Sequence, residues 1–196
     1  MVLGIIVEGD ADAQAYTALI PRIRRDEVTV IPEPCGGAAR LRKRFVDRLK
    51  RCEYIHHVDK ALVIRDSDCR GPKVVEDELE QELRHSGFKP SFPVHFYAPN
   101  CTLDTWLLAD EAAVKQVAQD RQRNQGGLPK IVRIKPLTGP LEGGKNAKTL
   151  FRQMLYQAGL PATAPVYAEV SAVASIDRIA QRCPYFQLFV ECVHAC

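Results

Sequence analysis

Carboxylates follow two apolar runs in this sequence. Residues 2–8 form a run that ends in Glu8, and residues 60–65 form a second run followed by Asp66 and Asp68. Residues i and i+2 point to the same side of an extended chain, so Asp66 and Asp68 can face one cation. Carboxylate oxygens are the ligands that Mg²⁺ and Mn²⁺ prefer. If folding brings the two strand ends together, these residues predict a divalent-metal site that acts on phosphates.

The same acids have a structural alternative. Aspartate is a favoured residue at the start of a helix, so Asp10, Asp12 and Asp68 can cap helices or close turns. This alternative is weaker for Glu8, because a carboxylate at the end of a buried strand is desolvated unless it has a partner. The presence of acids at both strand ends favours the metal site.

Apolar periodicity predicts the elements that must position these acids. Short runs of apolar residues predict four strands, and a stretch with an apolar stripe follows each of them. This alternation predicts an α/β fold with a short central, mainly parallel sheet and helices on both faces. Ligands bind at the C-terminal ends of such strands, where the acids stand. The predicted strands are residues 2–8, 28–31, 60–65 and 92–97, and the predicted helices are residues 10–24, 38–52, 74–86 and 103–117.

The pattern changes after residue 118. Residues 119–145 are rich in Arg, Gln, Gly, Pro and Lys without a clear period, which predicts a long basic loop or insertion. Helical stretches follow at about 146–158, 172–182 and 185–195. We therefore expect an α/β core over residues 1–118 and a helical C-terminal extension over residues 146–196 that packs on it.

Composition sets the class of protein. The chain has 196 residues, of which 46% are hydrophobic, enough for one domain with a proper core. No window is long and apolar enough to span a membrane, and the start lacks the basic region of a signal peptide, so we expect a cytoplasmic protein without membrane contact. A net charge of +3 is too mild to indicate nucleic-acid binding by itself.

The seven cysteines show no Cys-x-x-Cys pair, which argues against a structural zinc site of the usual spacing. Free thiols are expected, as in a reducing cytosol. Cys192, His194 and Cys196 stand close together in the sequence. They could form a metal clip, but the favoured interpretation is a helix end with free thiols.

Two motifs resemble those of the Toprim family. Val7-Glu8-Gly9 after an apolar strand is similar to the first Toprim motif, and Ile64-Arg65-Asp66-Ser67-Asp68 is similar to its Asp-x-Asp motif. Toprim domains occur in topoisomerases, bacterial primases, recombination proteins and OLD-family nucleases. The resemblance implies a Toprim-like three-layer fold, with Glu8 as general acid/base and metal ligand and with Asp66 and Asp68 as ligands and catalytic residues for Mg²⁺ or Mn²⁺.

A third stretch narrows the resemblance. Residues 103–110 resemble the Glu-Ala-Trp-Leu-Leu-Ala-Asp stretch of small, stand-alone bacterial Toprim-like proteins related to the OLD-family nucleases. The resemblance implies that Asp104 and Asp12, each an aspartate where glutamate is usual, are ligands of a second metal, and that Asp110 takes the last acidic position. Asp104 could instead be an ordinary first-turn acid of the predicted helix.

Basic residues could contact a nucleic-acid backbone. One helix face carries Arg40, Lys43 and Arg44, and Lys145 and Lys148 stand at a predicted helix start, where amides favour anions. All five could equally be solvated surface charges. The function expected is that of a nuclease, acting on DNA rather than RNA in phage defence or DNA repair.

Two further functions stay open. One is a non-cleaving regulatory or binding module, and the other is a phosphatase or nucleotidyl-transfer enzyme for small molecules. The resemblance also implies an ABC-type ATPase partner, because related proteins are often encoded beside such ATPases.

Overall fold

The computed structural model describes residues 1–25, 27–126, 132–134, 137, 141–144 and 146–196. Its centre is a sheet of four parallel strands in the order β2-β1-β3-β4, which confirms the predicted α/β class. The two central strands are nearly continuous apolar runs, as expected of strands that are covered on both faces. The strands are β1 (Val2–Val7), β2 (Thr29–Pro34), β3 (Lys60–Ile64) and β4 (Val94–Tyr97).

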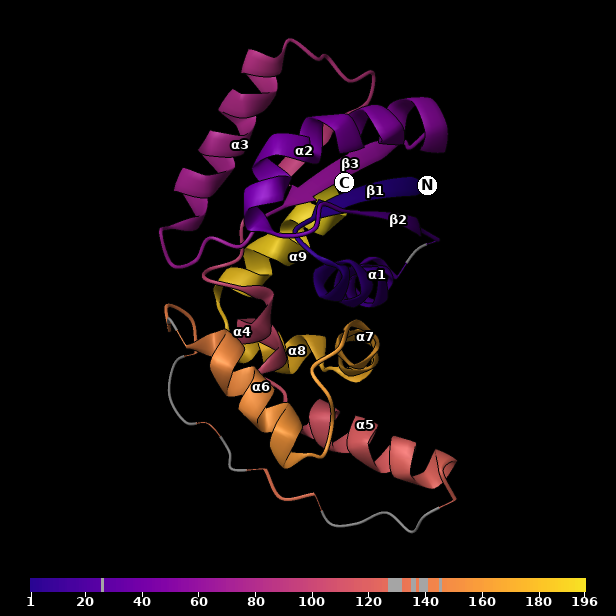
Figure 1. The fold of residues 1–196 in the computed structure, drawn as a ribbon, viewed down its shortest axis with the longest axis vertical. Coiled ribbons are helices and arrows are strands. Elements are labelled where there is room, and N and C mark those ends of the chain that lie inside the picture. Colours follow the sequence, from indigo (N-terminus) through magenta and orange to yellow (C-terminus); the bar gives the residue numbers. More distant parts are fainter. Residues whose placement is uncertain (26, 127–131, 135–136, 138–140, 145) are drawn as a thin grey trace.

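Helices cover both faces of this sheet, as predicted (Figure 1). Helices α2 (Ala38–Arg51) and α3 (Pro72–Ser86) pack on one face, and α1 (Asp10–Arg24) and α9 (Tyr185–Ala195) pack on the other. Strand β1 alternates between two apolar clusters, because Ile5 faces α1 whereas Ile6 faces α2. The result is a three-layer arrangement with the C-terminal ends of all four strands at one edge.

The remaining helices enlarge the apolar cluster on the α1 side. Trp106 is fully buried near its centre, with aromatic contacts to Tyr16, Tyr97, Phe186 and Phe189. The C-terminal helices therefore share one core with the sheet. These helices are α4 (Leu103–Leu107), α5 (Glu111–Asn124), α6 (Ala147–Gln157), α7 (Ala164–Val173) and α8 (Ile176–Arg182).

Two predicted helices are wrong in their extent. The single helix expected over residues 103–117 is divided into α4 and α5, and the stretch expected over residues 172–182 belongs to α7 and α8. One ion pair links the two breaks: Asp110, which precedes α5, accepts hydrogen bonds from the Ser175 amide (2.7 Å) and from Arg178 Nη1 (2.6 Å). Asp110, at the break between α4 and α5, thus fixes the chain at the break between α7 and α8.

Three smaller predictions also need correction. Strand β2 continues through Pro32 and Pro34, which is tolerated because β2 is an edge strand and one side of its backbone forms no ladder. The long loop begins later than expected, since α5 extends to Asn124. The helix expected to end at residue 52 continues, because a π-helix, η1 (Cys52–His56), prolongs α2. In the described part of the chain, no helix has the length and apolar character to cross a membrane.

Candidate metal centre

Glu8 stands directly after β1, at the centre of the strand-end edge. Ile6 pairs with Val63 in the parallel register, so the residues that follow β1 and β3 are neighbours. The Asp66 amide donates a hydrogen bond to Glu8 Oε1 at 3.2 Å, which connects the two predicted motifs directly. The pKa of Glu8 is raised to about 7, mainly by burial and then by the charges of Asp12 and Asp68.

Asp66 is the acid with the most carboxylates around it. Its Oδ1 accepts a hydrogen bond from the Leu103 amide at 3.3 Å, which joins the end of β3 to the start of α4. Burial and then the charges of Asp12 and Glu8 raise the pKa of Asp66 well above its ordinary value. The nearest cationic side chain in the sequence, Arg65, pairs with Glu78 at 3.0 Å instead.

Asp68 lies at the exposed rim of the site, in a loop with unusual backbone geometry. Asp68 and Cys69 have φ angles of 49° and 61°, a region that non-glycine residues seldom occupy. The Asp68 amide donates to the Cys101 carbonyl at 3.1 Å, and a disulfide joins Cys69 to Cys101. The expectation of free thiols is therefore wrong for this pair, and correct for Cys35, Cys52, Cys183, Cys192 and Cys196.

Asp12 has the capping role that the sequence left open, and it also lies among the other acids. Its Oδ2 accepts a hydrogen bond from the Gly9 amide at 3.1 Å, which is a capping contact at the start of α1. Burial raises the pKa of Asp12 to about 6; the Gly9 hydrogen bond opposes this rise, Asp104 adds to it and Lys148 opposes it. A helix cap and membership of the acidic site thus coexist in one residue.

Asp104 completes the group that we call the acidic cluster: Glu8, Asp12, Asp66, Asp68 and Asp104. Asp104 lies in α4, is only 4% exposed, and accepts a hydrogen bond from the Tyr167 hydroxyl at 2.7 Å. Among the described residues, no lysine or arginine forms an ion pair with any of the five carboxylates. The cluster is an excess of negative charge at one edge of the sheet.

Sequence reasoning missed two tyrosines beside the cluster. Tyr167 lies on α7, which was not predicted over these residues, and no local pattern marks it. Tyr16 follows Asp12 by four residues and therefore shares its face of α1. The Tyr16 hydroxyl is buried and has no hydrogen-bond partner among the residues that the structure describes, and burial followed by the charges of Asp66 and Asp12 raises the pKa of Tyr16. The spacing from Asp12 could have revealed Tyr16.

The donor set fits Mg²⁺ or Mn²⁺. All five side chains offer hard oxygen ligands. Burial is the largest cause of the raised pKa values of Glu8, Asp12 and Asp66, and neighbouring carboxylates add to it, a repulsion that a bound dication would relieve. Within the described residues, no three of these carboxylates place an oxygen each within 4.8 Å of one another. Mg²⁺ commonly takes only one or two carboxylates and keeps water or substrate phosphate as its other ligands, so two of these acids would be enough to hold it.

A cavity of about 310 Å³ adjoins the cluster. Lys148 stands on one of its walls, in the first turn of α6, a helix whose N-terminal amides receive no side-chain cap. Amides and a lysine at a helix start favour an anion. Lys145 lies outside the described residues. The cavity is lined by Asp68, Cys69, Cys101, Thr102, Gly144, Ala147 and Lys148.

Helix α2, which begins beside Glu8, also carries basic residues. The Gly37 amide donates to the Glu8 carbonyl at 2.6 Å, which fixes the start of α2 beside β1. Arg40, Lys43 and Arg44 are exposed and form no ion pair with the described residues. Other cations of this helix are engaged, since Arg42 pairs with Glu82, and Arg48 and Arg51 pair with Glu33.

Asp110 is not part of this site, contrary to what its position in the resemblance suggested. It is 3% exposed and bound to Arg178 and Ser175, as described above. Its role is to hold α8 against the start of α5.

Comparisons of the chain with protein-family models, with characterised proteins and with solved structures found no match.

Proposed function

We propose that this protein is a Toprim-like nuclease that uses Mg²⁺ or Mn²⁺ to cleave phosphodiester bonds. The observation that carries the proposal is the acidic cluster at the C-terminal edge of the parallel sheet, with the pKa of Glu8 raised to about 7 and that of Asp12 to about 6. Such a concentration of uncompensated carboxylates costs stability, and clusters of this kind mark functional sites.

The residues divide into three roles. Asp66 and Asp68 would hold the metal, with Asp12 and Asp104 as the acids nearest to a second position. A bound dication would stabilise the negative charge that develops on the phosphate oxygens. Glu8 has a pKa close to neutral pH, which suits a group that takes up and releases a proton at the reacting oxygen.

Cations near the cluster suit a polyanion. Lys148 lines the cavity beside Asp68, and Arg40, Lys43 and Arg44 are exposed on α2, the helix that begins beside Glu8. Such cations would attract the phosphate backbone of a nucleic-acid strand. We propose DNA as the substrate, a cytoplasmic site of action in phage defence or DNA repair, and an ABC-type ATPase as the partner.

A cleavage assay tests this function. Wild type, Glu8→Gln and Asp66→Asn are incubated with plasmid, single-stranded DNA and RNA in Mg²⁺ or Mn²⁺, with Asp10→Asn as the matched control because Asp10 is an exposed carboxylate beside the cluster. We expect DNA cleavage by wild type and the control, and a loss of at least about 100-fold in the two cluster variants. Equal cleavage in all four proteins would refute the assignment.

A specific observation favours a second function, that of a non-cleaving Toprim-like binding module. Asp12 and Asp104 each already accept a hydrogen bond from the protein, from the Gly9 amide and from the Tyr167 hydroxyl. Absence of cleavage together with metal-dependent DNA binding that is lost in Asp66→Asn would establish this function instead. Turnover of nucleotides but not of polymers would indicate a small-molecule enzyme.

A further inference from the structure

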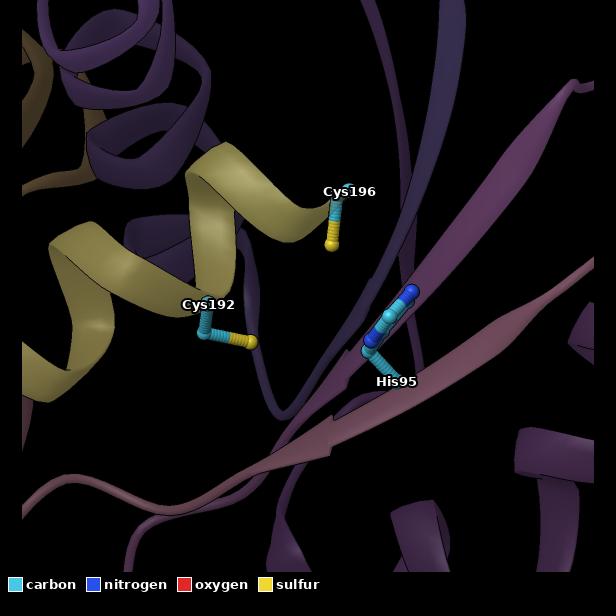
Figure 2. A group of neighbouring side chains, drawn as sticks. All are labelled: His95, Cys192 and Cys196. Atoms are coloured by element: carbon cyan, nitrogen blue, oxygen red, sulfur yellow. The ribbon is translucent and has the colours of Figure 1, made fainter.

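A second group of potential metal ligands lies between the edge strand β4 and the end of α9, and it shares no residue with the acidic cluster. His95 stands in the middle of the edge strand β4, two residues before Tyr97 and therefore on the same face, towards α9. Cys192 lies in the last turn of α9, and Cys196 directly follows the helix as its C-cap residue, with its amide bonded to the Cys192 carbonyl at 3.0 Å, so the two lie on one side of the helix end. Figure 2 shows the two cysteines above the strand that carries His95.

The three ligand atoms are close to one another. One nitrogen of His95 and the sulfurs of Cys192 and Cys196 all lie within 4.8 Å of one another, and they form the one such group of three in the described residues. Ligand atoms around a tetrahedral Zn²⁺ are about 3.5–3.8 Å apart. Changes of roughly 1 Å in side-chain position would therefore suffice to enclose the ion.

Helix α9 is held firmly in this position. Lys60 Nζ donates a hydrogen bond to the Ala195 carbonyl at 3.1 Å, and Arg24 Nη1 donates to the Val193 carbonyl at 3.2 Å. At the other end of the helix, the Tyr97 hydroxyl donates to the Tyr185 carbonyl at 3.0 Å. The cysteines are thus fixed opposite His95 by contacts that do not involve their own side chains.

We propose that His95, Cys192 and Cys196 bind Zn²⁺, with three protein ligands and a fourth position for water or another small ligand. Two sulfurs and an imidazole are soft and borderline donors, which select Zn²⁺ over Mg²⁺. The site therefore differs in chemistry, as well as in place, from the acidic cluster, and it does not depend on the proposed nuclease function. Bound zinc would also clamp α9 to the edge of the sheet.

The structure changes the partner that the sequence suggested for these cysteines. His194 would be the third ligand of the metal clip that the sequence left as an alternative, but it is exposed and lines a different cavity, together with Arg22 and Asp177. A residue between two helical positions four apart points to a different side, so His194 cannot share their face. His95, almost a hundred positions earlier in the chain, takes its place.

Metal binding by the whole chain tests the proposal. The protein is reduced, freed of reductant and metal, and titrated with Co²⁺ and then Zn²⁺ in the wild type and in His95→Gln, Cys192→Ser and Cys196→Ser. Cys35→Ser is the matched control, because Cys35 is also a free cysteine. Asp66→Asn separates this site from the acidic cluster.

We expect one Co²⁺ with thiolate charge-transfer absorption, displaced by Zn²⁺, in the wild type, Cys35→Ser and Asp66→Asn. Each ligand variant should lose the band and weaken zinc binding by at least about 10- to 100-fold, since loss of an outer partner alone has such an effect. Absence of the band in the wild type, or its persistence in all three ligand variants, would overturn the proposal.

Alkylation of the wild type gives a readout that does not require a folded variant. Zn²⁺ should slow the reaction of iodoacetamide with Cys192, which is partly exposed, as mapped by mass spectrometry. An unchanged rate would count against the site. A Cys192–Cys196 disulfide that forms readily in air, with no zinc taken up after reduction, would replace the metal site by a redox pair and refute the proposal.

Discussion

Replacement of Glu8 by glutamine removes one negative charge from the acidic cluster and changes the shape of the side chain very little. Glu8 is partly buried, and burial, Asp12 and Asp68 raise its pKa from 4.5 to about 7. The folded protein therefore binds this proton more tightly than the unfolded chain does. The contribution of Glu8 to the free energy of unfolding should be highest below pH 4.5 and should fall as the pH rises to about 7 and Glu8 ionises in the crowded site.

The size of this effect follows from the pKa change. Between 4.5 and about 7, each pH unit corresponds to 1.36 kcal/mol, which gives an upper limit of about 3 kcal/mol. Solvent at the partly exposed carboxylate reduces this to about 1–3 kcal/mol. Because glutamine stays neutral, Glu8→Gln should make the metal-free protein more stable than the wild type by this amount at pH 8, and by almost nothing at pH 4.5.

Urea denaturation in EDTA at pH 4.5, 6 and 8 measures the difference. Asp10→Asn is the control: it removes an exposed carboxylate from the first turn of α1 and should change stability by only about 0.3–1 kcal/mol, in the destabilising direction. A repeat in Mg²⁺ should reduce the advantage of the variant, since the ion stabilises the wild type by about 2.7 kcal/mol at 100 times its Kd and binds the variant less tightly. A Glu8→Gln protein that is less stable than the wild type at pH 8 in EDTA would refute the electrostatic account.

Three further substitutions test individual contacts. Tyr167→Phe leaves an oxygen of the buried Asp104 without its hydrogen bond, so we expect a loss of about 1–3 kcal/mol in urea denaturation and weaker metal binding by calorimetry; unchanged values for both would show that the contact is unimportant. Arg178→Ala should cost about 1.5–3 kcal/mol by removing the partner of Asp110, yet leave metal affinity unchanged, and an altered affinity would contradict the separation of Asp110 from the site. Replacement of Cys69 and Cys101 by serine removes a disulfide that spans 32 positions and should lower the free energy of unfolding by about 3–4 kcal/mol. Dithiothreitol should lower the stability of the wild type by the same amount and should leave that of the variant unchanged. Equal stability of the reduced and oxidised wild type would refute this prediction.

Local sequence signals were sufficient for the strand-end acids. The apolar runs before Glu8 and Asp66 predicted two strands, and alternation with helices predicted that these strands are parallel, which places both acids at one edge. The hydrogen bond from the Asp66 amide to Glu8 confirms that they are neighbours. Whether they bind metal stays a prediction.

The rest of the site depends on contacts between distant parts of the chain. Tyr167 lies 63 positions from Asp104, on a helix that begins at Ala164, where no helix was predicted, and Pro165 in its first turn is a favoured helix start. The Cys69–Cys101 disulfide has no local signal either. The prolines of β2 are compatible with a strand only because β2 lies at the sheet edge, and strand order is a property of the whole fold.

Anomalous diffraction from a crystal soaked in Mn²⁺ tests the central claim most directly. The account predicts a manganese peak within coordination distance of Asp66 and at least one other carboxylate of the acidic cluster, and loss of that peak in Asp66→Asn. Mn²⁺ density that is absent from this edge of the sheet in a crystal of the wild-type protein at neutral pH would contradict it.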